Sequence, residues 1–233
     1  MKDQDYDLAV AYRIYPKISK RPPIFHRNKY LLARLCLKTF KESLDSLKVK
    51  IFAILDNCPT EYEELFKEYF NEKDLEIIKP QGIGNQATFD LQLEVLLKQN
   101  NSEFVYFAED DYFFLPLKFK KMLSFLKKDP EVDIISPYDH PDHYNSFLHR
   151  YKSNIKSFAN HHWRSVNSTT CSFLTTKKIL EKNKKIFKIY SKKSYIIELS
   201  MWVCLTKYGV FNPFRVTKFA VQKSAFLLYY LNA

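Results

Sequence analysis

Glycine is scarce in this sequence, with three residues among 233. This scarcity excludes folds built on glycine repeats and makes each glycine a candidate for a turn. Long apolar runs are also missing, and none approaches the roughly 18 residues of a membrane span. The N-terminus, Met-Lys-Asp-Gln-Asp-Tyr-Asp, lacks the apolar core of a signal peptide. We therefore expect a cytoplasmic protein, and contact with the inner face of a membrane remains open.

Cysteine pairs with functional spacing are absent as well. The four cysteines, at positions 36, 58, 171 and 204, form neither CxxC nor metal-ligand spacing. We expect them to be reduced core thiols. No low-complexity or Pro/Gly-rich linker divides the chain, so we expect a single domain over residues 1–233.

Basic residues exceed acidic ones, and the net charge is +11. This excess favours polyanionic partners, which include nucleic acid, an anionic membrane surface and nucleotide phosphates. Composition alone cannot choose among them. The richest basic segment, Lys177 to Lys193, predicts one helix with a solvated face followed by a basic loop, in preference to a dedicated binding surface.

Strand-like and helix-like patterns alternate through the first half of the chain. The strand-like runs are at 7–12, 49–55, 75–78 and from 103 onward, and the helical patterns are at 30–47, from 60 onward, and at 87–99. This order is typical of right-handed βαβ units. The predicted fold class is α/β with a mostly parallel central sheet.

The fourth strand-like run ends in three consecutive carboxylates, Glu109, Asp110 and Asp111. Like charges side by side repel each other unless a cation neutralises them. Mg²⁺ or Mn²⁺ could do so, because such ions take one or two protein carboxylates and complete their shell with water and phosphate oxygens. A solvated acidic turn is the alternative interpretation.

Other polar residues also follow the predicted strands. In parallel sheets ligands bind beyond the carboxyl ends of the strands, and the residues there are Tyr12, Arg13, Asp56, Asn57, Gly84 and Asn85. Solvated loops explain their polarity but not their convergence on one edge. The Gly84-Asn-Gln stretch could form an anion site at a helix N-terminus. The spacing matches neither a P-loop nor a dinucleotide-binding GxGxxG motif.

Taken together, these segments resemble glycosyltransferases of the GT-A fold. The resemblance covers most of the chain and is carried by Ala11-Tyr12-Arg13, Leu55-Asp56, 84–97, the DxD-like motif Glu109-Asp110-Asp111-Tyr112, 137–144 and 162–170. It implies that Asp111 binds the metal directly, with Glu109 or Asp110 bonding the ribose or a metal-bound water. It further implies a nucleotide-sugar site that also contains Tyr12, Arg13, Asp56, Gly84 and Asn85, with Asp56 on the base.

Inverting transfer needs a base for the acceptor hydroxyl, and Glu198 is the candidate. Its segment resembles the acidic residue and helix that follow the acceptor site in inverting enzymes of this fold. Leu199 departs from their usual Glu-Asp pair. The alternative is a carboxylate that the dipole favours at the N-terminus of a helix.

A polar loop and a later polar segment are predicted to contact the acceptor or the diphosphate. The residues are Asp139, His140, His162, Trp163 and Arg164. An indole beside a guanidinium suits stacking on a sugar and holding phosphate. Asp139, His140, Asp142 and His143 could instead bind a second metal, but Pro141 argues against helical ligand pairing.

The resemblance implies a metal-dependent, inverting glycosyltransferase in polysaccharide biosynthesis. Its donor would be a UDP, GDP or dTDP sugar bound by residues 1–115, and its saccharide or lipid-linked acceptor would be bound by residues 116–233. Nucleic acid is not expected, because the carboxylates repel a phosphate backbone unless metal is bound. The alternatives are a nucleotidyltransferase, a non-catalytic basic nucleic-acid-binding module and an inactive binding subunit. The apolar segment 226–231 could pack on the domain, rest on a membrane surface or form an oligomer contact, and packing on the domain is favoured.

Overall fold

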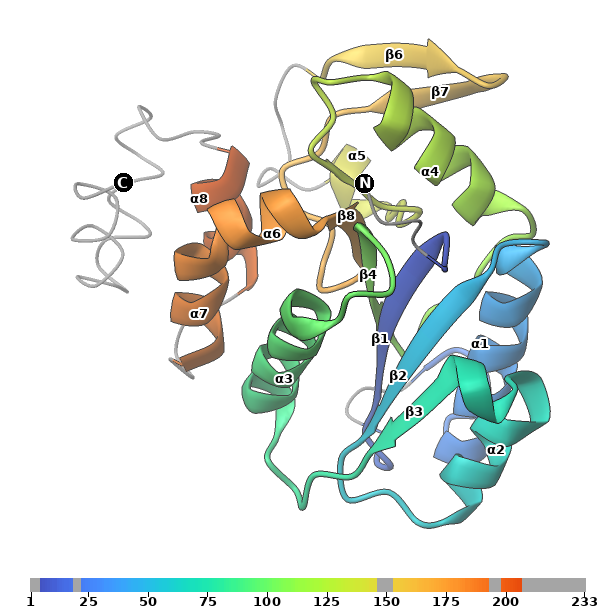
Figure 1. Cartoon of the computed structure of the whole chain (residues 1–233). Coiled ribbons are helices and arrows are strands. Elements are labelled where there is room, and N and C mark those ends of the chain that lie inside the picture. The colour runs from blue at the N-terminus through green and yellow to red at the C-terminus, as the bar shows by residue number, and fades with distance from the viewer. Residues whose placement is uncertain (1–4, 19–21, 146–152, 193–197, 207–233) are drawn as a thin grey trace. The chain divides into compact units, whose positions relative to one another are not determined.

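The computed structural model describes residues 5–18, 22–145, 153–192 and 198–206 (Figure 1). Internal contacts divide the chain into two compact units. The first unit contains residues 1–137 and 171–182, and the second contains residues 138–170 and 183–233. The predicted tail at 226–231 lies outside the described residues, and the single-domain organisation stays a prediction.

A six-stranded, mostly parallel sheet forms the centre of the first unit, in the order β3-β2-β1-β4-β8-β5. Parallel pairs join β3 to β2, β2 to β1 and β1 to β4, and β8 runs antiparallel to both of its neighbours. The strands are β1 (Leu8–Ile14), β2 (Val49–Leu55), β3 (Leu75–Ile78), β4 (Phe104–Glu109), β5 (Ile134–Ile135) and β8 (Phe173–Thr176). The predicted α/β class with a mostly parallel sheet is therefore confirmed.

Helices cover both faces of this sheet (Figure 1). They are α1 (Lys29–Leu44), α2 (Glu61–Tyr69), α3 (Asn85–Lys98), α4 (Lys118–Lys128) and α6 (Lys177–Lys182), with a 3₁₀ turn at Glu72–Asp74. Successive side chains of a strand point to opposite faces. Tyr12 packs against Phe40 of α1 and Phe66 of α2, at ring distances of 5.3 and 5.5 Å. The next residue, Arg13, points to the opposite face, toward α3.

The described residues of the second unit form a hairpin and three helices. Its elements are α5 (Asp142–Asn145), β6 (Ile155–Phe158), β7 (His161–Arg164), α7 (Lys184–Lys192) and α8 (Glu198–Thr206). The hairpin turn consists of Ala159 and Asn160, whose φ angles are 51° and 59°. Two positive φ values are typical of a type I′ turn, whose twist matches that of the paired strands.

The prediction for the basic segment is wrong in its second part. We expected one helix followed by a basic loop, but a first helix ends at Lys182 and a second helix occupies Lys184–Lys192. The Asn183 carbonyl accepts hydrogen bonds from the amides of Ile186 and Phe187, so Asn183 opens the second helix. Phe187 and Tyr190 are buried on one face of that helix, and this burial stabilises it despite its lysines.

All four cysteines are free thiols. Cys36 and Cys171 are buried in the core, as predicted, whereas Cys58 and Cys204 are partly exposed. Among the helices that the structure describes, none is both long and apolar enough to cross a membrane.

Candidate functional site

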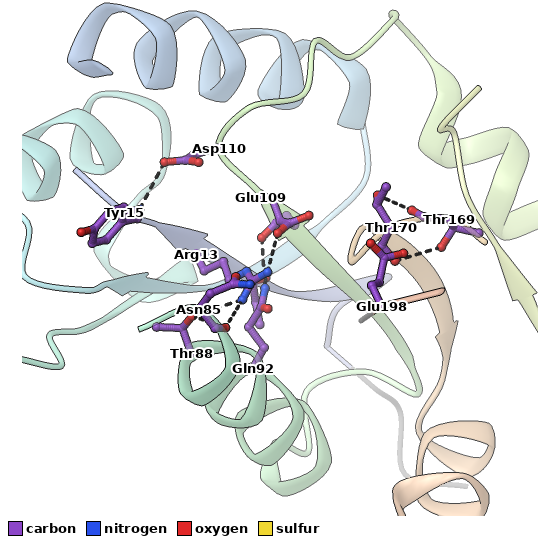
Figure 2. A network of polar contacts seen from close by, with 12 residues as sticks. Arg13, Tyr15, Asn85, Thr88, Gln92, Glu109, Asp110, Thr169, Thr170 and Glu198 are labelled. Atoms are coloured by element: carbon purple, nitrogen blue, oxygen red, sulfur yellow. Dashed lines mark hydrogen bonds and ion pairs between the residues drawn. The ribbon is translucent and has the colours of Figure 1, made fainter. Parts of the chain in front are cut away.

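Arg13 joins three elements at the carboxyl edge of the parallel sheet (Figure 2). Its Nη1 donates to the carbonyl of Asn85 at 2.6 Å and to Oγ1 of Thr88 at 3.1 Å, both in the first turn of α3. Its Nη2 forms an ion pair with Glu109, the last residue of β4. Arg13 is buried, so the guanidinium neutralises Glu109 and fixes the start of α3.

Gln92 joins the same two strands from the buried face of α3. Its Nε2 donates to the carbonyls of Ala11 at 2.7 Å and Ala108 at 3.0 Å. Because a buried carbonyl without a partner is costly, this amide stabilises the region where β1 and β4 approach their carboxyl ends. In the sequence, Gln92 stood out as a polar residue on the apolar face of a predicted helix, and this pattern could have indicated a buried polar contact.

Asp110 is buried and has a cationic partner that the sequence analysis missed. Lys29, the first residue of α1, places Nζ 2.9 Å from Oδ1, and the amide of Tyr15 donates to Oδ2 at 3.3 Å. Burial raises the pKa of Asp110, while Lys29 and the Tyr15 amide act in the opposite direction. A lysine in the first turn of a helix opposes the dipole, and this mismatch was a readable signal.

Asp111 follows in the turn and remains exposed to solvent. The surrounding protein raises its pKa to about 6, first by desolvation of the carboxyl group and then by the negative charges of Glu109 and Asp110; Lys29 and Arg13 oppose the shift. The local field at Asp111 is therefore negative despite two nearby cations, and a bound divalent cation would relieve it.

The residues present fit Mg²⁺ or Mn²⁺ bound chiefly through substrate. Among the residues the structure describes, no group of three or more His, Cys, Asp or Glu side chains could hold a metal ion. Mg²⁺ does not need such a group, because one or two carboxylates with water and phosphate oxygens complete its shell. An exposed carboxylate with a raised pKa, as at Asp111, suits that kind of site.

Asp56, predicted to contact the nucleotide base, is buried at the end of β2. Its Oδ1 accepts from the amide of Ile83 and its Oδ2 from the amide of Gly84, both at 2.9 Å. Gly84 has φ of 85°, a conformation that favours glycine, and its carbonyl accepts from Thr88. Asp56 thus shapes the loop that leads into α3 and positions Gly84.

Tyr12 does not lie among these polar groups. It is fully buried on the opposite face of β1, and its hydroxyl has no hydrogen-bond partner among the described residues. Burial raises the pKa of its hydroxyl well above the usual value. We therefore assign Tyr12 to the core and leave it out of the candidate donor site.

In the second unit, Glu198 is the first residue of α8 and Figure 2 shows it with Thr169 and Thr170. Its Oε1 accepts from Oγ of Ser168 at 3.1 Å and from Nε1 of Trp202 at 2.8 Å. The same Nε1 lies 2.9 Å from the carbonyl oxygen of Thr170. Neither Ser168 nor Trp202 was identified as a partner of Glu198 from the sequence. The Ser168 contact joins distant segments, whereas Trp202 lies four residues after Glu198 in the same helix, a spacing that was a readable signal.

Asp139 and Arg164 are brought together in this unit, as their predicted shared role requires. Arg164 lies 3.4 Å from Asp139 and 4.0 Å above the ring of Tyr144, whose hydroxyl donates to Asp139 at 2.9 Å. His140 stacks on Tyr138 at 5.7 Å. These contacts form an exposed cluster of charged and aromatic side chains.

His162 and Trp163 lie on β7 and make contacts inside the hairpin. His162 Nδ1 is 3.0 Å from Oγ of Ser157, and Nε1 of Trp163 donates to the carbonyl of Phe158 at 3.2 Å. Trp163 stacks on His161 at 6.1 Å. These two predicted acceptor residues thus have hairpin partners, whereas Arg164 points its guanidinium to Asp139.

Comparison with solved structures identifies a shared fold. A fragment of TarS from S. aureus has a TM-score of 0.50 at 12% identity, and the match covers 79% of this chain and 54% of that one. The mannosyltransferase PcManGT from Pyrobaculum calidifontis, solved with GDP-Man and Mn²⁺, has a TM-score of 0.48 at 13% identity, covering 77% and 47%. The 4-diphosphocytidyl-2C-methyl-D-erythritol synthase from Anaerococcus prevotii has a TM-score of 0.49 at 11% identity, and the match covers 88% of this chain and 84% of that one.

No family model matches the sequence, and no curated protein matches it either. The chain spans about half the length of the first two structures above. At 12% identity the TarS likeness shows the fold alone. The chain therefore has a GT-A-like α/β fold, as the sequence predicted.

Proposed function

We propose that this chain is a metal-dependent, inverting glycosyltransferase that uses a nucleotide-diphosphate sugar. The observation that carries the proposal is the acidic end of β4. Two of its carboxylates, Glu109 and Asp110, have cationic partners, while Asp111 is exposed in a negative field. The acceptor would be a saccharide or a lipid-linked saccharide.

The donor side combines a cation site with a helix that begins at the same edge. Asp111 would hold Mn²⁺ or Mg²⁺, which when bound offsets the negative charge that develops on a leaving diphosphate. The N-terminal turn of α3 favours an anion nearby, and Arg13 holds that turn through Asn85 and Thr88. Glu109 and Asp110 are proposed to contact the ribose or a metal-bound water.

Glu198 is the proposed base. A carboxylate can take the proton of an acceptor hydroxyl as that oxygen attacks the sugar carbon. Its Oε1 accepts hydrogen bonds from the neutral donors Ser168 and Trp202, and hydrogen bonds to a carboxylate favour its ionised form. Asp139 and Arg164 are proposed to bind the acceptor, since exposed Asp139 pairs with half-buried Arg164 beside the Tyr144 ring.

Calorimetric titration with UDP, GDP and dTDP, each with and without Mn²⁺, tests the donor side. At least one nucleotide should bind, and its affinity should fall when Mn²⁺ is omitted. Binding of none of the three, or binding indifferent to Mn²⁺, contradicts the proposal. A matched titration of Asp111→Asn should give no metal-dependent binding.

Assays with other ligands separate the competing functions. A nucleotidyltransferase would bind CTP or UTP and release pyrophosphate; Tyr12-Arg-Ile-Tyr-Pro16 contains no glycine-rich signature of that class. A nucleic-acid-binding module would bind an oligonucleotide with an affinity that falls steeply with salt. If either result were obtained and no nucleotide sugar were turned over, the proposed function would be wrong.

A further inference from the structure

The loop Asn167–Thr170 is a buried polar segment of the second unit. Asn167, Ser168 and Thr169 are 2%, 9% and 5% exposed. Thr170 has φ of 59°. A β-branched residue pays a steric cost at positive φ, and such strain persists only where surrounding contacts over-determine the conformation. The position of this loop is therefore held by specific partners.

Two helices supply those partners. From α5, the Nε2 atom of buried His143 lies 3.1 Å from the carbonyl oxygen of Ser168. From α8, Nε1 of Trp202 donates to the carbonyl of Thr170 at 2.9 Å. The backbone is thus fixed on both sides of Thr169, and the Ser168 hydroxyl is held at a defined place.

Both side chains converge on one oxygen of Glu198. Ser168 Oγ donates to Oε1 at 3.1 Å, and Trp202 Nε1 donates to the same atom at 2.8 Å. Trp202 lies one helical turn after Glu198, so its ring reaches back along the same face of α8. Because Trp202 is only 2% exposed, packing fixes the indole, and the indole in turn restricts the carboxylate.

We propose that Ser168 and Trp202 are positioning residues that hold Glu198 in the orientation of a base. This inference rests on the proposed function and extends it to two residues that do not touch substrate. One O–H donor and one N–H donor on the same oxygen stabilise the ionised carboxylate and restrict its rotation. The strained loop exists because it places one of those donors.

Tryptophan emission tests the contact without any substrate. The chain has two tryptophans, so Trp163→Phe leaves Trp202 as the single emitter. A carboxylate beside the indole N–H stabilises the excited-state dipole, and adding Glu198→Gln should therefore shift emission to shorter wavelength. Unchanged emission would overturn the contact. Trp163→Phe combined with Ser191→Ala, which removes a buried α7 hydroxyl bonded to Lys188, should leave the emission unchanged.

Nucleotide release from UDP-, GDP- and dTDP-sugars tests the positioning role. Ser168→Ala and Trp202→Phe should each lower turnover by about 10- to 100-fold and leave Mn²⁺-dependent nucleotide affinity unchanged. Ser168→Thr, which keeps the hydroxyl, should restore most of the turnover. Ser191→Ala should match the wild type. Full turnover in Ser168→Ala beside an inactive Glu198→Gln would overturn the proposal.

The two failures are distinguishable. If the wild type binds no nucleotide and releases none, the proposed function fails, while the emission measurement still reports whether Trp202 contacts a carboxylate. If the wild type is active and Glu198→Gln is equally active, the base assignment fails, and the positioning role fails with it.

Discussion

The carboxylates of the two units have described partners of different kinds. In the first unit, Glu109 and Asp110 are paired with Arg13 and Lys29, so cations offset their charge. In the second unit, Glu198 accepts hydrogen bonds from the Ser168 hydroxyl and the Trp202 indole. In the first unit, cations of the protein therefore offset a row of like charges, whereas in the second unit hydrogen bonds restrict the orientation of a carboxylate.

The largest expected effect comes from removing the cation in the first unit. Arg13→Ala leaves the Glu109 carboxylate without its buried partner, and loss of one partner of a buried pair costs about 3–5 kcal/mol. Urea denaturation should show this decrease in the free energy of unfolding. Arg34→Ala breaks an exposed pair with Glu68 and should cost far less, because solvent screens an exposed pair. Equal losses would contradict the role of Arg13.

Removal of the Asp56 carboxylate should have a smaller effect. Asp56→Ala leaves the amides of Ile83 and Gly84 without their acceptor, which costs about 1–3 kcal/mol. The loop before α3 should loosen, and nucleotide affinity should fall with it. Asp7→Ala is the matched control, because exposed Asp7 also accepts from a backbone amide, that of Lys48. A loss of stability no larger than the control's would show that Asp56 does not shape the loop.

Asp111→Asn should stabilise the metal-free protein while abolishing metal-dependent nucleotide binding. The folded-state pKa of Asp111 is about 6, above the ordinary 3.8, so its contribution to stability is present at low pH and lost as pH rises through 6. The stability advantage of the variant should therefore grow from pH 4 to pH 7.5. Urea denaturation without metal at both pH values measures it, and a variant less stable than wild type at pH 7.5 would be the contrary result.

The smallest effect concerns two partly exposed thiols. Burial raises the pKa of Cys58 to about 12, with further contributions from the carboxylates of Asp110 and Asp56. Burial alone raises the pKa of Cys204 to about 11. Asp110→Asn should therefore speed iodoacetamide labelling of Cys58 and leave Cys204 unchanged. Mass spectrometry of both peptides from one sample provides the comparison, and an equal change at both thiols would indicate general loosening of the fold.

The sequence predicted the parallel core well, because its signals are local. The runs at 49–55 and 75–78 coincide with β2 and β3, and α3 begins at Asn85, two residues before the predicted helix. Apolar runs bounded by turn residues specify such strands directly. By contrast, β6 and β7 were not predicted, since their residues are largely polar and their turn contains no glycine.

The candidate site was predicted less completely, because its partners come from distant segments. The carboxylates stood out as a row, but the pairing of Asp110 with Lys29 spans 81 positions and has no periodic signal. The side chains of Gln92 and Ser168 also contact residues far along the chain. Tyr12 was predicted to belong to the site because it adjoins Arg13, but it is buried on the other face of the strand.

The central claim is that the two units carry separate roles, and one paired measurement tests it most directly. Nucleotide binding with Mn²⁺ and nucleotide release from the corresponding sugar donor are measured for wild type, Asp111→Asn and Glu198→Gln. We predict that Asp111→Asn loses both, whereas Glu198→Gln binds nucleotide like the wild type and releases none from the donor. Equal loss of binding in the two variants, or normal binding in Asp111→Asn, would contradict the account.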